Sequence, residues 1–226
     1  MCGRFALDHT WAEIHAGMSL VPSCAAGRND PPRYNIAPTQ DVGFLHRGHE
    51  TGELTVSDGR WWLVPFWAKE IPKYPMFNAR SETAREKSSF RGAFKSKRCL
   101  VPASGYFEWT KADDGKKDPH FIHLPEKKSF MFAGLWTYNS NFDITSCTIL
   151  TAAAAPEIEH LHHRMPIILN EIAFDGWLDG DNSADEAHAM LADNQGASLV
   201  SYCVGREVGS SRASGADLIE QICPQQ

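Results

Sequence analysis

The sequence predicts one α+β domain over residues 1–226, with a mainly antiparallel, barrel-like curled sheet and peripheral helices. Many short segments alternate apolar with polar residues or form short apolar runs, and both patterns are typical of strands. Segments with helical periodicity lie between these strands and near the C-terminus, and no stretch of the sequence resembles a linker. With 226 residues, 42% of them hydrophobic, the chain is long enough to bury a hydrophobic core.

The N-terminal half opens with a short strand at 4–7 and a helix. Thr10 and Glu13 have the spacing of a capping box, which predicts a helix that begins at Thr10 and runs through Met18. Residues 21–40 are rich in Pro, Gly and Asn and are expected to form a long loop ending in YNIAPTQ. Further on, the sequence predicts strands at 42–47, 52–57 and 60–64 and a short helix at 81–89, with Ser81 or Asn78 near its N-cap.

The second half is richer in strands. Asp113-Asp114-Gly115 predicts a tight turn between two of them, and Pro156 predicts the start of a short helix. The expected strands are 98–102, 105–110, 119–124, 130–136, 145–152 and 198–204, and the expected helices are 170–178, 183–193 and 216–222.

Charge is distributed unevenly along the chain. The net charge of −6 argues against a general nucleic-acid-binding protein. Residues 60–98, however, contain ten Lys or Arg against three Glu, whereas residues 171–220 contain ten acidic residues against two Arg. A basic middle and an acidic tail predict one positive face that could meet phosphates, although a solvated charged helix explains the charge pattern equally well.

The sequence also predicts a cytoplasmic protein. No apolar run approaches the roughly 20 residues of a membrane-spanning helix, and the N-terminus MCGRFALDHT lacks the features of a secretory signal. The six cysteines form no CxxC pair, and Cys99 and Cys147 lie in apolar strand-like runs that predict reduced, buried thiols.

Cys2 is the first residue with a chemical prediction attached. Methionine is removed when the next side chain is small, so loss of Met1 should leave Cys2 with an α-amine and a thiol on adjacent carbons. An α-amine has a pKa of about 8, so a useful fraction is neutral at pH 7. Such a 1,2-aminothiol reacts with an aldehyde through a Schiff base that the thiol closes to a thiazolidine. By itself the MCG start is weak support, because a small residue can follow Met by chance.

Five further segments, together with the MCGRF start, make the prediction specific. They occur in one order along nearly the whole chain: MCGRF, RYNIAPTQ, RWWLVPFWAKE, FNARSET, RCLVPASGYFEW and HHRMPIIL. Together they closely resemble the SRAP family, whose members are known as SOS-response-associated peptidases or abasic-site processing proteins. The segment after residue 200 matches the family loosely. The resemblance implies that the chain recognises abasic sites in single-stranded DNA and captures them covalently through its N-terminal Cys.

The resemblance also implies roles for individual residues. Cys2 matches the nucleophile, Asn78 the asparagine that holds the opened sugar, and Glu108 the active-site glutamate. His162, two residues before Arg164, matches the family's histidine, and its neighbour His163 is the alternative. The arginines that match phosphate contacts are Arg4, Arg80 and Arg164.

The chemistry independently calls for these residue types. Opening the closed sugar moves a proton between its oxygens, which suits a histidine with a pKa near neutrality. Forming the Schiff base requires a group that both takes and gives protons, which suits a carboxyl whose pKa is raised by burial. Glu108 lies in the apolar segment GYFEW, although an outward-facing strand position is equally compatible with its sequence.

Beside the basic middle lies an aromatic cluster of Trp61, Trp62, Phe66 and Trp67, whose alternate members are expected to be in the core. Phe66 or Trp67 is expected to stack on or wedge against bases flanking the lesion. Asn35 and Pro38 shape either a pocket wall or a purely structural loop. His160, His162 and His163 lack the partners of a zinc site, so neither a metal nor a cofactor is predicted. The expected partner is abasic single-stranded DNA, with a monomeric protein that joins the nucleoid when bound.

Two other functions use the same residues. A cysteine autopeptidase, or N-terminal-nucleophile hydrolase, would use Cys2 with His162 or Glu108 as base to remove its own Met1. It would have no need of the basic segment 60–98. A non-catalytic DNA-binding or protein-interaction module would leave the position of Cys2 unexplained.

Overall fold

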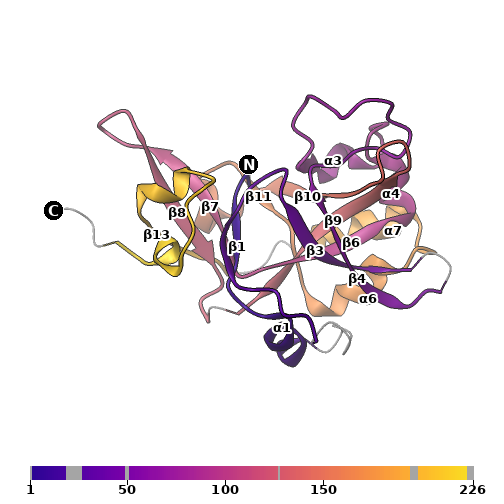
Figure 1. The fold of residues 1–226 in the computed structure, drawn as a ribbon, viewed down its shortest axis with the longest axis horizontal. Coiled ribbons are helices and arrows are strands. Elements are labelled where there is room, and N and C mark those ends of the chain that lie inside the picture. The colour runs from indigo at the N-terminus through magenta and orange to yellow at the C-terminus, as the bar shows by residue number, and fades with distance from the viewer. Residues whose placement is uncertain (1, 19–26, 49–50, 127, 194–197, 223–226) are drawn as a thin grey trace.

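Two sheets lie against each other in the computed structural model, which describes residues 2–18, 27–48, 51–126, 128–193 and 198–222 (Figure 1). The smaller sheet is antiparallel throughout. Its five strands, in spatial order, are β13 (Val200–Cys203), β8 (Lys117–His123), β7 (Gly105–Lys111), β1 (Phe5–Leu7) and β2 (Arg33–Ile36).

The larger sheet closes on itself. Strand β10 pairs with β4 on one side and with β9 on the other, so β10, β4, β3, β6 and β9 form a ring. Its strands are β3 (Asp41–Arg47), β4 (Leu54–Trp61), β5 (Asn78–Arg80), β6 (Arg98–Ala103), β9 (Phe130–Asn139), β10 (Ile144–Ala153), β11 (Arg164–Pro166) and β12 (Ile168–Leu169). Only the short pairings of β10 with β4 and β5 are parallel. The predicted α+β class with a curled, mainly antiparallel sheet is therefore confirmed.

The helices are short and lie outside the sheets (Figure 1). The α-helices are α1 (Trp11–Gly17), α3 (Ser81–Ala84), α4 (Arg91–Ser96), α5 (Pro156–Glu159), α6 (Phe174–Leu178) and α7 (Ala184–Asp193). Three 3-10 turns are η1 (Glu171–Ala173), η2 (Arg206–Gly209) and η3 (Ala216–Ile219). The predicted capping box is present, because the Thr10 side chain accepts from the Glu13 backbone and the Glu13 side chain accepts from the Thr10 backbone.

Strand β7 separates two parts of the core. Successive strand residues point to opposite faces, so Tyr106 and Glu108 share one face while Phe107 points to the other. Tyr106 packs in a cluster with Cys2, Phe5 and residues of the larger sheet. Phe107 packs instead with Phe121, Val208 and Leu218, where the C-terminal segment covers the outer face of the smaller sheet.

Arg98 joins the helices to the ring. Its guanidinium is almost fully buried and donates to the carbonyl oxygens of Phe94 and Trp177, near the C-terminal ends of α4 and α6. Carbonyls at a helix C-terminus lack partners within the helix and carry partial negative charge, so they stabilise a buried cation there.

Several predicted elements differ from the structure. The predicted loop at 21–40 contains strand β2, whereas residues 21–26 lie outside the described part of the chain. The predicted strands at 52–57 and 60–64 form one strand that ends at Trp61. The helix predicted at 81–89 ends at Ala84, and its N-cap is Arg80 without a side-chain cap, because Asn78 lies in β5. Helix α4 was not predicted, and the C-terminal helix is only a 3-10 turn.

Candidate active site

Cys2 lies three residues before the start of β1, and its side chain is fully buried. Its thiol donates weakly to the Arg4 carbonyl oxygen, with Sγ 3.8 Å away. The same oxygen accepts from the Phe107 backbone N–H at 2.9 Å, so the sulfur lies above the seam between β1 and β7. Burial raises the pKa of the Cys2 thiol well above its usual value, and the charge of Glu108 raises it further. The thiol is therefore protonated at rest.

Asn78 holds Cys2 from the larger sheet. Strand β5 pairs with β10, with Asn78 opposite Ile149. The Asn78 side-chain N–H donates to the Cys2 carbonyl oxygen at 2.7 Å. Its Oδ1 is buried and has no hydrogen-bond partner among the described residues. Asn78 thus fixes Cys2 while keeping one acceptor for another molecule.

Glu108 lies in the middle of β7, on the face where Cys2 packs. Its side chain is only 4% exposed, so the alternative of an outward-facing strand position is wrong. Burial raises the pKa of the Glu108 carboxyl, while the nearby charges of His163 and Lys117 oppose that rise. A carboxyl whose pKa is raised by burial holds a proton more readily than an exposed carboxyl, as a group that both takes and gives protons requires.

His162 and His163 follow α5, with their rings stacked 4.4 Å apart. His162 Nδ1 accepts from the Arg164 backbone N–H at 2.9 Å, and the Arg164 carbonyl oxygen lies 3.1 Å from the same nitrogen. The neutral ring can therefore accept there and the protonated ring can donate, without a change of position. Burial lowers the pKa of His162. His163 is exposed but lies near enough to influence Glu108, so both histidines border the site.

The three predicted phosphate-binding arginines differ in environment. Arg80 is exposed at the start of α3. Arg164 is 9% exposed and donates to Glu82 Oε2 at 2.9 Å and to the Thr151 carbonyl oxygen at 2.6 Å. The same contact lowers the pKa of the Glu82 carboxyl. Phosphate binding by all three stays a prediction, and Arg80 is the one whose side chain is open to solvent.

Arg4 is held by the C-terminal segment. Its guanidinium donates to Asn35 Oδ1 at 2.6 Å, to the Val208 carbonyl oxygen at 2.7 Å and to the Gly209 carbonyl oxygen at 3.3 Å. Asn35 in turn donates to the carbonyl oxygens of Ser210 and Ala213, each at 2.9 Å. We call these contacts the Arg4–Asn35 clamp. They show that Asn35 ties β2 to the C-terminal segment.

Comparison with known proteins gives the chain its family. The sequence model of the family described as SOS response associated peptidase (SRAP) matches residues 1–211. The chain belongs to the SRAP family.

Curated SRAP relatives match this chain from end to end. The abasic site processing protein YoaM of Bacillus subtilis is 34% identical over 97% of this chain and 98% of its own. The abasic site processing protein YedK of Escherichia coli is 30% identical over 98% of this chain and 100% of its own. The crystal structure of a phage-related protein of Bordetella bronchiseptica, 26% identical, has a TM-score of 0.76 and covers 94% of this chain and 99% of its own.

An apolar loop stands out on this SRAP chain. Phe66 and Trp67 are 59% and 51% exposed, as their predicted stacking role requires, and Ile71 and Tyr74 on the same loop are 38% and 82% exposed. The loop is anchored at its base, because Asn139 donates to the carbonyl oxygens of Pro65 and Ala68 at 2.7 and 3.0 Å. Sequence reasoning missed Tyr74, although its position between Lys73 and Pro75 was a signal for an exposed loop.

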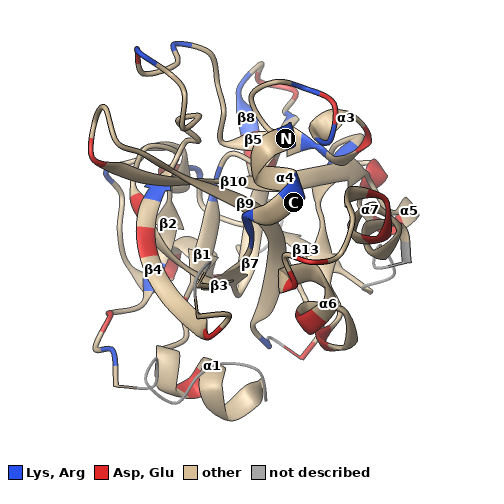
Figure 2. Ribbon diagram, turned by 90° about the vertical axis from the view of Figure 1, so that its right-hand side faces the viewer, with Lys and Arg blue, Asp and Glu red and all other residues tan. Residues whose placement is uncertain are grey.

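The uneven charge along the sequence is also seen in the fold, where basic and acidic residues gather on different elements. Figure 2 shows Lys and Arg around β5 and α3, whereas α6 and α7 carry Asp and Glu. Asn78 and Arg80 lie together in β5, and the acidic helix α7 reaches the same basic region, because Asp185 pairs with Arg85 just after α3.

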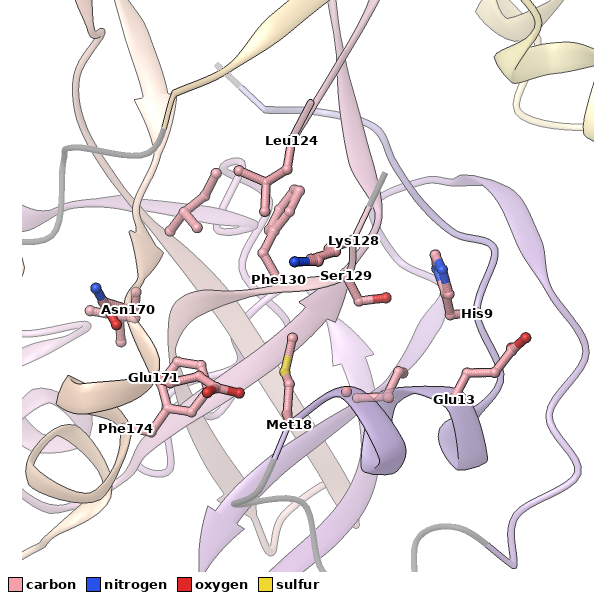
Figure 3. A pocket seen from close by; sticks show the side chains of 14 residues that line it. His9, Glu13, Met18, Leu124, Lys128, Ser129, Phe130, Asn170, Glu171 and Phe174 are labelled. Carbon is pink, nitrogen blue, oxygen red and sulfur yellow. The ribbon is translucent and has the colours of Figure 1, made fainter. Parts of the chain in front are cut away.

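The remaining features of the molecule do not point to a second reactive site. Among the described residues, no group of three or more His, Cys, Asp or Glu could hold a metal ion. A cavity of about 660 Å³ lies between α1 and η1, lined by His9, Glu13, Met18, Phe130 and Phe174 and separate from Cys2 (Figure 3). No helix in the described part of the chain is long and apolar enough to cross a membrane.

Proposed function

We propose that this chain processes abasic sites in single-stranded DNA by forming a covalent thiazolidine cross-link through Cys2. The observation that carries the proposal is the 2.7 Å hydrogen bond by which Asn78 holds the Cys2 main chain beside the buried carboxyl of Glu108. The names of the relatives YoaM and YedK support the substrate. Met1 lies outside the described residues, so its removal is a premise of the proposal.

The reaction balances without a cofactor. The Cys2 α-amine adds to the aldehyde carbon of the opened deoxyribose, and loss of one water gives an imine. The sulfur then attacks the imine carbon, the C=N π bond breaks, and the thiol proton ends on the nitrogen. The product is a five-membered ring of the Cys2 nitrogen, Cα, Cβ and sulfur with the sugar carbon.

Glu108 and His162 divide the proton transfers. Glu108, with its raised pKa, takes a proton from the α-ammonium and returns it to the departing hydroxyl. His162, held by Arg164 in either protonation state, moves the proton between the sugar oxygens when the ring opens. The free Oδ1 of Asn78 accepts a hydrogen bond from the opened sugar.

The exposed groups supply the contacts with DNA. Arg80 lies two residues from Asn78 and meets a phosphate next to the lesion. Phe66 and Trp67 offer ring faces on which unpaired bases can stack, which is worth about 1–3 kcal/mol per base. Because stacking needs bases that are free on one face, single-stranded DNA fits these contacts better than an intact duplex.

Intact mass spectrometry tests the proposal. The protein is incubated with an abasic single-stranded oligonucleotide, and the expected product has the summed mass of both minus one water, survives heating and begins at Cys2. An oligonucleotide whose abasic aldehyde was first reduced with borohydride is the matched control and should give no adduct. A chain that retains Met1 yet cross-links at full rate would contradict the mechanism.

The autopeptidase alternative needs its own experiment, because it uses the same Cys2. The chain is translated in vitro with methionine aminopeptidase inhibited, and the N-terminal residue is read by mass. If Met1 leaves only when Cys2 is present, the chain is also an autopeptidase. Cross-linking by the processed chain is then measured separately, since the two activities can coexist.

A further inference from the structure

Tyr106 has a buried hydroxyl group without a partner. The side chain is 0% exposed, and its hydroxyl has no hydrogen-bond partner among the described residues. Leaving a buried polar group unpaired lowers stability, so such groups are rare and call for an explanation. Phenylalanine at this position would avoid the cost with almost the same shape.

The position of Tyr106 places this hydroxyl on the Cys2 side of the smaller sheet. Tyr106 is opposite Phe5 in the pairing of β1 with β7, and it shares its face with Glu108. The Cys2 sulfur lies above the same seam, through its contact with Arg4, and both residues belong to one packed cluster. Burial raises the pKa of the Tyr106 hydroxyl, and the charges of Cys2 and Glu108 raise it further, so the group keeps its proton.

The cross-linking chemistry needs a donor at the sulfur. In the resting state the thiol donates to the Arg4 carbonyl oxygen, which is an acceptor and cannot stabilise a thiolate. The thiol must give up its proton before the sulfur can attack the imine carbon, so negative charge forms on the sulfur in a buried place that disfavours charge. A hydrogen bond from a neutral donor offsets this penalty at the moment the charge forms.

We propose that the Tyr106 hydroxyl donates a hydrogen bond to the Cys2 sulfur as the thiazolidine ring closes, and that Tyr106 therefore sets the rate of closure. This inference rests on the proposed cross-linking function. The thiol proton passes to Glu108 and on to the imine nitrogen, the S–C bond forms, and Tyr106 keeps its own proton throughout. Ring opening passes through the same charged state, so Tyr106 accelerates opening and closure alike.

The test is Tyr106→Phe, which removes only the hydroxyl. Schiff-base formation, read as adduct trapped by borohydride at early times, should keep its rate. Conversion to the adduct that survives heating without reductant should slow about tenfold, the effect of one hydrogen bond to a charged group. Release of DNA during a chase with excess abasic oligonucleotide should slow by the same factor. The melting temperature should stay the same or rise, because an unpaired buried hydroxyl is gone.

Thr148→Val is the matched control. Thr148 is also fully buried with an unpartnered hydroxyl, but it alternates with Cys147 and Ile149, which pack in the cluster that contains Cys2. Its side chain therefore points to the opposite face of β10. Thr148→Val should leave both steps at the wild-type rate.

The outcomes separate the inference from the proposed function. Equal closure rates in Tyr106→Phe and wild type would overturn the inference while leaving cross-linking intact. Equal slowing of Schiff-base formation and closure would also overturn it, because the hydroxyl would then act on the whole site rather than on the sulfur. A wild-type chain that forms no adduct would instead overturn the proposed function.

Discussion

The polar groups on the two sides of strand β1 differ in how many hydrogen bonds they make. On the side of the larger sheet, Asn78 and Tyr106 each have a buried polar atom beside Cys2 that finds no partner in the described part of the chain. On the side of the C-terminal segment, the Arg4–Asn35 clamp makes five hydrogen bonds and leaves one buried atom, Arg4 Nε, unpaired among the described residues. Unpaired buried groups lower stability, and paired ones hold structure. The comparison separates a side prepared for a substrate from a side that fixes the strand.

Glu108→Gln tests the substrate side and should have the largest effect. Loss of the carboxyl should slow Schiff-base formation about 10²–10⁴-fold, the range of general acid–base catalysis. The pKa of Glu108 is raised by burial, so the folded protein binds this proton more tightly than the unfolded chain. Wild-type stability should therefore fall as pH rises from the unfolded pKa through the raised folded one, and Glu108→Gln should remove that part of the pH dependence. Quenched time courses measure the rate of Schiff-base formation, and denaturant unfolding at several pH values measures the stability.

His162→Ala should slow capture and release of DNA by about 10²-fold, the lower end for a group that moves protons. The adduct, once formed, should be as stable as in wild type. His163→Ala is the paired control and should do neither, because the His163 ring is exposed, whereas Arg164 holds the His162 ring in place. A defect in His163→Ala alone would move the role to that residue. The measurement is a cross-linking time course followed by a chase.

Arg4→Lys tests the clamp side and should lower the rate of cross-linking at saturating DNA about tenfold, because small displacements of reacting groups slow a reaction strongly. Lysine keeps the charge, so DNA affinity and its salt dependence should change little if Arg4 also meets a phosphate. It cannot, however, donate to Asn35, Val208 and Gly209 in one fixed geometry.

Arg33→Lys is the matched control for Arg4→Lys. Arg33 donates to the Asp41 carbonyl oxygen at 2.6 Å and to Gln40 at 2.7 Å, on the same strand pair but away from the clamp. It should cross-link at the wild-type rate. If both lysine variants lose rate equally, the loss reflects general stability and not the position of Cys2.

Arg80→Ala should have the smallest effect. The exposed side chain should contribute one phosphate contact, so its loss should lower the slope of log affinity against log salt by about 0.7, the value for one contact on single-stranded DNA. Ring closure after capture should be unchanged. Titrations at several salt concentrations measure the slope, and an unchanged slope would remove Arg80 from the DNA contacts.

The sequence predicts most of this fold because its signals are local. The capping box at Thr10, the turn at Gly115 and the apolar runs of β6 and β10 each depend on neighbouring residues alone. Strand β2 was missed because its backbone pairs with β1, which is distant in the sequence, and α4 was missed because its polar surface hides a short buried face. Local patterns cannot show such contacts.

The candidate site was likewise predictable only in part from the sequence. The family resemblance singles out Cys2, Asn78, Glu108 and His162, and the structure places Asn78 and Glu108 around Cys2 with His162 beside His163. What the sequence could not show is which polar atoms remain unpaired. Tyr106 was treated as part of an apolar segment, and Arg4 was expected to face DNA alone. Both conclusions depend on distant segments, the larger sheet for one and the C-terminal turns for the other.

The apolar loop offers a route to protein engineering. Strand β10 pairs in parallel with Trp61 through Cys147 and with Asn78 through Ile149, so both ends of the loop are fastened to one strand only two residues apart. Insertions and exchanges within residues 65–75 should therefore leave the register of the sheet and the position of Asn78 unchanged. Grafting loops from other family members would then change which neighbouring bases are favoured while the chemistry at Cys2 stays the same.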